Sequence, residues 1–372
     1  MNGPKWTESA EDGGYWSVVT HDLATEVLKT PGVFTSEDGM RLGGNPAAVR
    51  AAAGRMLTVS DGPRHRRIKA VHTPWFNSRA MAALSDDLQE RLDGHVGALV
   101  AREEPFDVMS ELARKFPAWT VFRMMGIPEG DWDHLARCTD TAYDESEAGP
   151  DGRIARSVAH MELLDYFATL ADRRRADPGD DIVSALVHTE VDGSTLSDDE
   201  VVLNCDGLVV GGLQTTRHAA AGAVVAFAEH PREWFRLRAD PALLPTATEE
   251  VLRWTSPPMH VLRTARTDVV LGGAPIRAGE RIVVWIPSCN RDERVFPDAE
   301  VFDVDRRPNP HLSFSAGPHY CVGARLGRLE LECYLRALAR FVAGFDLVGS
   351  PVRLKSNFLT GWTAVPVSCR PG

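Results

Sequence analysis

Apolar residues recur at spacings of three and four along most of the first two thirds of the chain. This is the period of an amphipathic α-helix, so the pattern requires a mainly helical protein. Helices are predicted at, among others, residues 21–30, 79–101, 247–255 and 324–342. Strand patterns are short and scattered. They lie at residues 15–20, at 268–276 followed by 280–287 around a Gly-Gly turn, and at 363–369.

We therefore expect a mainly α fold with small peripheral β-sheets. Turn-forming residues at 173–181 and 308–310 predict loops rather than linkers, and the chain shows no internal repeat or low-complexity segment. With 44% hydrophobic and 25% charged residues, the composition is that of an ordinary globular protein. The sequence thus favours one integrated domain over residues 1–372.

The number of cysteines and the net charge indicate the cellular compartment and exclude some classes of partner. Six cysteines are scattered without a C-x-x-C pair, which favours a reducing compartment. The first residues lack an apolar signal region, and no run of about 18 apolar residues follows, so neither secretion nor a membrane anchor is expected. A net charge of −11 argues against nucleic acid as a partner. We expect a soluble cytoplasmic protein.

One cysteine lies in an unusual setting. Phe314, Gly317, His319, Cys321 and Gly323 form the pattern F-x-x-G-x-H-x-C-x-G, immediately before the predicted helix 324–342. Glycines allow the backbone to approach a large flat group, and a thiolate at a helix N-terminus is stabilised by the free N–H groups. A lone cysteine is more often a small core residue. The surrounding pattern favours a ligand instead.

This stretch resembles the haem-binding loop of the cytochrome P-450 superfamily, and the resemblance to its soluble bacterial members extends over nearly the whole chain. It implies that Cys321 is the thiolate ligand of the iron of haem b. It implies that Phe314, Gly317, His319 and Gly323 contact the cofactor. The haem is then expected between the Cys321 loop and a long helix at 201–231.

That long apolar segment is interrupted by Gly211 and Gly212, which suggests a close approach of backbone to a ligand. It resembles the family motif A-G-x-(D/E)-T-T of the helix above the haem. Thr215 then corresponds to the threonine that holds water and dioxygen for proton delivery. Gln214 stands where the family has an acid, and an amide cannot ionise near neutral pH. The alternative is a long core helix loosened by threonine back-bonding.

A second motif, E-x-x-R, places Glu250 and Arg253 on one face of a helix, where they can pair. A surface ion pair would give the same pattern. The resemblance implies a structural role without chemistry, in which a third basic group joins the pair. We expect Arg306 to be that group, with His311 as the alternate.

Basic residues are needed for the two propionates of a haem. His65 and Lys69 lie four apart on one helical face, in a segment that resembles the family's D-P-P-x-H-x-x-x-R. Lys69 replaces the usual arginine and keeps only the charge. Arg263 matches R-x-A-x-x-D-V on a strand, and His319 completes the expected group of four.

Three further arginines, Arg64, Arg66 and Arg67, are expected to form a solvated basic face that could attract an acidic redox partner. Substrate contacts are placed by the resemblance alone. They comprise residues 40–60, residues 140–165, Met259, His260, Val261, Phe358 and Leu359.

Three functions compete. The first is a monooxygenase that uses dioxygen and two electrons from a ferredoxin or flavodoxin to oxidise a small molecule, free or bound to a carrier protein. Such enzymes of bacterial type more often serve secondary metabolism. The second is a haem-thiolate enzyme of another outcome, namely oxidative coupling, ring closure, nitration or peroxide-driven oxidation, which Gln214 favours. The third, a haem-binding sensor, has no need of Thr215.

Overall fold

The computed structural model describes residues 3–9, 13–143, 149–190 and 193–372. Its α-helices are α1 His21–Lys29, α2 Pro46–Ala52, α3 Gly62–His72, α4 Ser78–Val100, α5 Lys115–Met124, α6 Trp132–Ala142, α7 Pro150–Ala176, α8 Ile182–His188, α9 Asp198–Glu229, α10 Pro231–Ala239, α11 Leu244–Thr255, α12 Ile286–Cys289 and α13 Ala324–Phe341. Its strands are β1 Lys5–Thr7, β2 Tyr15–Val18, β3 Phe34–Thr35, β4 Phe106–Asp107, β5 His260–Ala265, β6 Val269–Leu271, β7 Ala274–Ile276, β8 Arg281–Trp285, β9 Val342–Leu347, β10 Val352–Arg353, β11 Trp362–Ala364 and β12 Pro366–Pro371.

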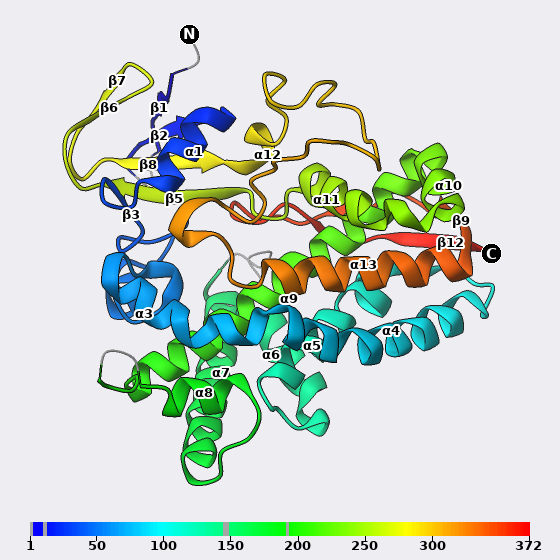
Figure 1. The fold of residues 1–372 in the computed structure, drawn as a ribbon, viewed down its shortest axis with the longest axis horizontal. Helices are drawn as coiled ribbons and strands as arrows, with labels where there is room; N and C mark the ends of the chain where they lie inside the picture. Colours follow the sequence, from blue (N-terminus) through cyan, green and yellow to red (C-terminus); the bar gives the residue numbers. More distant parts are fainter. Residues whose placement is uncertain (1–2, 10–12, 144–148, 191–192) are drawn as a thin grey trace.

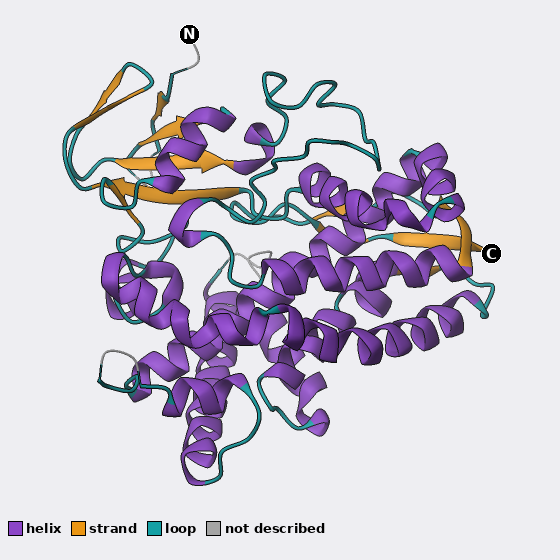
Figure 2. Cartoon of the chain, in the orientation of Figure 1, coloured by secondary structure: helices purple, strands orange, loops and turns teal. Residues whose placement is uncertain are grey.

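Helices make up most of the molecule, and the largest sheet lies at one side (Figures 1 and 2). That sheet has the order β1-β2-β8-β5-β3 and is antiparallel except for the parallel pair β2 and β8. A three-stranded sheet, β4-β12-β9, lies near the C-terminus, and β6 with β7 and β10 with β11 form two-stranded sheets. The predicted mainly α fold with small peripheral sheets is confirmed.

The longest helix, α9, spans Asp198–Glu229 rather than the expected 201–231. It begins earlier because Ser197 and Glu200 form a capping box, in which each side chain bonds the other residue's backbone N–H. It ends at Glu229 because Pro231 starts α10, and a proline disfavours helical backbone in the residue before it. In Figure 1, α9 passes beside α13 in the middle of the helical part.

Two sequence expectations need correction. Residues 173–176 are the last turn of α7 and not a loop, and three arginines there lie at the helix end that favours cations. Helix α13 stops at Phe341, because the chain then extends as β9 and pairs with β12. Short strands such as β1, β3 and β4 carry too few residues to show a period.

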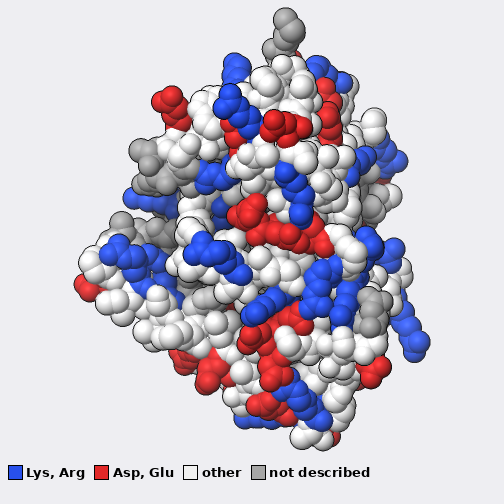
Figure 3. Space-filling model, turned by 90° about the vertical axis from the view of Figure 1, so that its left-hand side faces the viewer, with Lys and Arg blue, Asp and Glu red and all other residues white. Residues whose placement is uncertain are grey.

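Two large apolar clusters form much of the core. The largest apolar cluster packs α4, α9, α11 and α13 together, and a second packs α5 to α9. On the face drawn in Figure 3, basic and acidic side chains are interspersed. Within the described part of the chain, no helix has the length and hydropathy required to cross a membrane.

Candidate functional site

Cys321 lies between the short helix η6 (Gly317–His319) and α13. Its N–H donates to the carbonyl oxygen of Phe314 at 2.9 Å, which closes the loop. It is exposed, whereas the other five cysteines are buried or partly buried. Desolvation nevertheless raises the pKa of its thiol, against the opposing effect of the Gly323 N–H.

The four basic residues expected at the propionates come together near this loop. The rings of His65 and His319 are 4.2 Å apart between centroids. Lys69 donates from Nζ to the carbonyl oxygens of Pro318 at 2.6 Å and Tyr320 at 3.1 Å, so it also supports the Cys321 loop. Burial, reinforced by the charges of His319, Lys69 and Arg263, lowers the pKa of His65 to about 4.

Arg263, on β5, provides a test of whether an anion fits here. Its side chain is buried, with 3% of the residue exposed, and Nη1 donates only to the carbonyl oxygen of the adjacent Leu262, at 2.7 Å. Among the described residues no carboxylate lies within ion-pair distance of it, and burial lowers its pKa to about 10. A buried cation without an ion-pair partner is costly, although the charge of Asp61 acts on it from beyond ion-pair distance, so the site fits an anionic group such as a haem propionate.

Asp61 is a site residue that the sequence reasoning missed. Its carboxylate binds His319 Nε2 at 2.9 Å, the Thr35 hydroxyl at 2.6 Å and the Ser36 N–H at 2.9 Å. Burial favours its neutral form, but these hydrogen bonds outweigh burial and hold its pKa well below the usual range. It therefore fixes the orientation of His319. The signal was present in the quoted motif, whose first letter is this aspartate.

The paired glycines of α9 have different roles. A side chain at Gly211 would have no atom within 4 Å, so this glycine faces open space and fits the approach of a ligand. A side chain at Gly212 would come within 2.5 Å of Val121 in α5, so that glycine serves helix packing instead. Thr215 lies one turn beyond Gly211 on the same open face, where its hydroxyl donates to the Gly211 carbonyl oxygen at 2.9 Å.

Gln214 points away from this face. It is buried, and its Oε1 accepts a hydrogen bond from Arg217, which also pairs with Asp140 of α6. Its Nε2 has no partner among the described residues. The position at which the family has an acid is therefore occupied by an amide held by a cation, and the nearest carboxylate in this chain of contacts is Asp140.

The two loop glycines differ in their surroundings. Gly317 has φ of +67°, and a side chain there would come within 2.6 Å of the Leu28 carbonyl oxygen, so contact with α1 explains this glycine without a cofactor. A side chain at Gly323 would make ordinary van der Waals contacts with the Phe76 ring, at 3.8 Å, and with the Cys321 sulfur, at 3.9 Å. The ring of Phe314 lies beneath Arg328, whose Cζ is 4.6 Å from its centroid.

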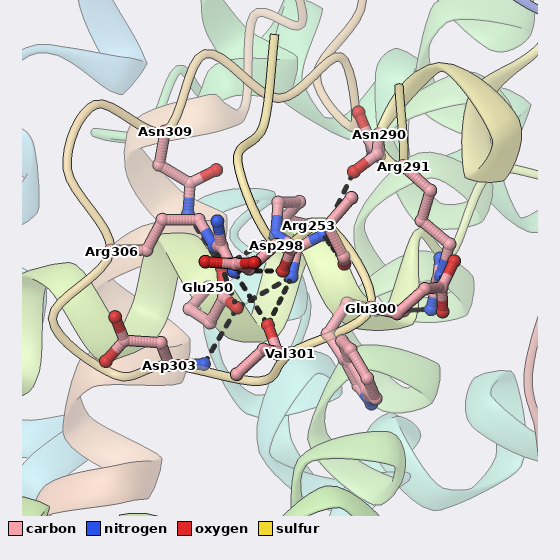
Figure 4. Close-up of polar contacts among 12 residues, drawn as sticks. Glu250, Arg253, Asn290, Arg291, Asp298, Glu300, Val301, Asp303, Arg306 and Asn309 are labelled. Carbon is pink, nitrogen blue, oxygen red and sulfur yellow. Dashed lines mark hydrogen bonds and ion pairs between the residues drawn. The ribbon is translucent and has the colours of Figure 1, made fainter. Parts of the chain in front are cut away.

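The E-x-x-R pair is fully buried, and Figure 4 shows its polar contacts. Arg253 donates to both oxygens of Glu250, at 2.8 Å and 2.7 Å. Arg306 supplies the third basic group, with Nε 3.2 Å and 3.1 Å from the same two oxygens. The alternate, His311, instead binds Glu249 at 3.1 Å. Both arginines also donate to loop carbonyl oxygens, so the group ties α11 to the segment before the cysteine.

The segments expected to contact substrate meet around β5. His260 is buried, and its Nε2 accepts from the Leu42 N–H at 3.0 Å, so it anchors the 40–60 segment rather than facing a pocket. The ring centroids of Phe358 and His260 are 5.5 Å apart, and the Arg41 guanidinium lies over the Phe358 ring. The others in this set are joined by backbone contacts. The Met259 N–H donates to the Phe358 carbonyl oxygen, Val261 pairs with Val284, and Leu359 forms a bridge with Pro258.

The 140–165 segment also reaches α9, although residues 144–148 lie outside the described residues. The Tyr143 hydroxyl donates to Asp206 at 2.9 Å, and His160 Nε2 lies 3.3 Å from the same carboxylate. The hydrogen bond with Asp206 raises the pKa of His160. Asp206 was not predicted, although an acid within the apolar start of α9 was a visible signal.

The expected basic face on α3 is only partly present. Arg66 is exposed, as expected. Arg64 instead pairs with Glu200 and donates to the Gly54 carbonyl oxygen, and Arg67 donates to the Ser194 carbonyl oxygen at 2.6 Å. Two of the three arginines therefore hold neighbouring segments together.

Comparisons with known proteins agree with this architecture. The family model described as Cytochrome P450 matches residues 236–348. The chain is 36% identical to Cytochrome P450 NovI of Streptomyces niveus over 96% of this chain and 87% of that protein. It is 33% identical to the Steroid C26-monooxygenase of Mycolicibacterium smegmatis over 96% of this chain and 84% of that protein. The crystal structure of P450 OxyD, described as involved in the biosynthesis of vancomycin-type antibiotics, superposes with a TM-score of 0.88 at 36% identity and covers 100% of this chain and 94% of that one.

A mainly helical fold with small peripheral sheets, in which an exposed cysteine comes just before a helix, agrees with the class of haem-thiolate proteins. The chain belongs to the cytochrome P450 family. It is an oxidoreductase of the monooxygenase type.

Proposed function

We propose that this enzyme inserts one oxygen atom from dioxygen into a small organic molecule of a secondary-metabolite pathway, with residues 1–372 acting as one catalytic domain. The observation that carries the proposal is an exposed Cys321 just before α13, together with the open face of α9 at Gly211 and Thr215, in a P450 fold. The part played in secondary metabolism is supported by the similarity to OxyD. The substrate is either free or presented on a carrier protein.

The residues fit haem b. Cys321 would bind the iron, and the cationic group of His65, Lys69, Arg263 and His319 would hold the propionates. When bound, haem supplies the activation of dioxygen by two electrons. Haem does not itself supply these two electrons, so we expect a ferredoxin or a flavodoxin to donate them.

Within the protein, Thr215 holds a proton at its hydroxyl on the open face of α9. The Gly211 carbonyl oxygen accepts that proton's hydrogen bond, which orients the hydroxyl until water or substrate competes for it. Gln214 cannot release a proton near neutral pH, so proton delivery relies on Thr215, ordered water or the substrate.

The cysteine assignment is tested by the absorption of the reduced carbon monoxide complex. Wild-type protein should show the red-shifted band that thiolate ligation produces, and Cys321→Ser should lose it. Cys369→Ser is the matched control, because this partly buried cysteine belongs to β12 and not to the site. Retention of the band by Cys321→Ser would refute the assignment.

A second function, oxidation without oxygen insertion, is favoured by Gln214 alone. The two are separated by measuring product formed per reducing equivalent, with dioxygen and with hydrogen peroxide. For a monooxygenase, Thr215→Ala should divert reducing equivalents to hydrogen peroxide, Thr215→Ser should retain product, and Gln214→Glu should raise or preserve the yield. A lower yield in Gln214→Glu favours the second function. If Thr215→Ala leaves the product formed per reducing equivalent unchanged, this turn of α9 does not control proton delivery.

A further inference from the structure

Three different metal-binding groups converge between α6 and α7, away from the cysteine loop. His134 and Cys138 lie one turn apart on α6, and Glu162 faces them from α7. The distances are 3.6 Å from His134 Nε2 to Cys138 Sγ, 3.5 Å from Sγ to Glu162 Oε2, and 3.0 Å from Nε2 to Oε1. This is the one group of three or more such residues found among the described residues.

These distances are close to the edges of a small coordination tetrahedron, with the sulfur contact made to Oε2 of Glu162 and the nitrogen contact to Oε1. Zinc bonds of about 2.0–2.1 Å to nitrogen, about 2.3 Å to sulfur and about 2.0–2.2 Å to oxygen give ligand-to-ligand edges of about 3.3–3.6 Å. The two edges at the sulfur already have this length. The shorter edge from nitrogen to oxygen is a direct hydrogen bond, and an ion would need to open it by only a few tenths of an ångström.

The surroundings supply an entry path and a fourth ligand. His134 and Glu162 are each about half exposed, whereas Cys138 is buried beneath them. His134 and Glu162 also line a cavity of about 220 Å³ that Asp165 and Tyr166 share. Water from this cavity can complete four-fold coordination.

We propose that His134, Cys138 and Glu162 form a binding site for a zinc-class divalent cation that joins α6 to α7. A thiolate, an imidazole and a carboxylate suit zinc, whereas magnesium and calcium require oxygen ligands. Coordination releases the Cys138 thiol proton to the buffer. Tyr143 directly follows the last residue of α6. An ion that joins α6 to α7 would therefore restrain the position of Tyr143 relative to α7.

The test is a calorimetric titration of the haem-loaded protein, free of any histidine tag, with zinc chloride. One zinc per chain should bind, magnesium chloride should give no binding, and the Tm should rise with zinc. His134→Ala, Cys138→Ser and Glu162→Gln should each weaken binding at least about tenfold, because each removes one ligand. Cys369→Ser should bind as wild type does.

Two variants guard against misfolding. Cys138 is buried, but His134 and Glu162 are not, so their substitution should leave the haem absorption unchanged. Wild-type protein without zinc affinity, or equal affinity in all three variants, would overturn the proposal. The cluster would then be a hydrogen bond between His134 and Glu162 with a hydrogen-bonded thiol beside it.

Discussion

Glu330 is a buried acid whose ionisation should set a pH limit on stability. It lies on α13, with 1% of the residue exposed, and accepts hydrogen bonds from Thr120 of α5 and Thr216 of α9. Burial raises its pKa from 4.5 to about 8, although these hydrogen bonds act in the opposite direction. The folded protein therefore keeps a proton on Glu330 at neutral pH, whereas the unfolded chain loses it.

The sign and size follow from this difference. Below pH 4.5 both states are protonated, and Glu330 adds no pH dependence. Between pH 4.5 and 8 the unfolded chain releases the proton first, so the free energy of unfolding falls by about 1.4 kcal/mol per pH unit. At pH 7 the loss reaches about 3 kcal/mol. Glu330→Gln, which cannot ionise and has nearly the same shape, should abolish this loss.

The assay is urea unfolding of both proteins at equal haem occupancy, followed by circular dichroism from pH 5 to pH 9. The unfolding free energy of Glu330→Gln minus that of wild type should increase from pH 5 to about pH 8 and then level off, with unchanged denaturant slopes. Glu293→Gln, at an exposed position, is the control and should give a flat difference. A flat difference for Glu330→Gln as well would refute the reasoning, because the buried acid would then ionise alike in both states.

Two further predictions concern buried charges. Arg263→Ala should weaken haem retention by about 1.5–3 kcal/mol, because a charge-assisted hydrogen bond is lost. Transfer of haem to apomyoglobin measures it, with Arg66→Ala as the exposed control, and equal retention would exclude Arg263 from the site. Glu250→Gln should lower the free energy of unfolding by about 3–5 kcal/mol, because it leaves Arg253 and Arg306 buried without a counter-charge. Urea unfolding measures it, and a loss below about 1 kcal/mol would show that the loop carbonyl oxygens suffice for both arginines.

The sequence by itself determined the helical architecture and the place of the key cysteine. Periodicity over long segments predicts α4, α11 and α13 to within a few residues, because a helix repeats its buried face every turn. The loop motif singled out Cys321 among six cysteines, since its glycines and the following helix lie within a few residues of it. Both signals are local, so a single sequence carries them.

Tertiary structure decided what each polar group faces. The sequence could not show that Gly212 packs against Val121, or that Gln214 is held by Arg217 rather than turned toward Thr215. The contact of Arg217 with Asp140 joins residues 77 apart in the chain. Such contacts depend on the angle and position at which two helices pack. The periodicity of residues within one helix does not specify how that helix packs against another. The sequence therefore names the chemistry of each residue, and the packing of distant segments determines which of these groups meet.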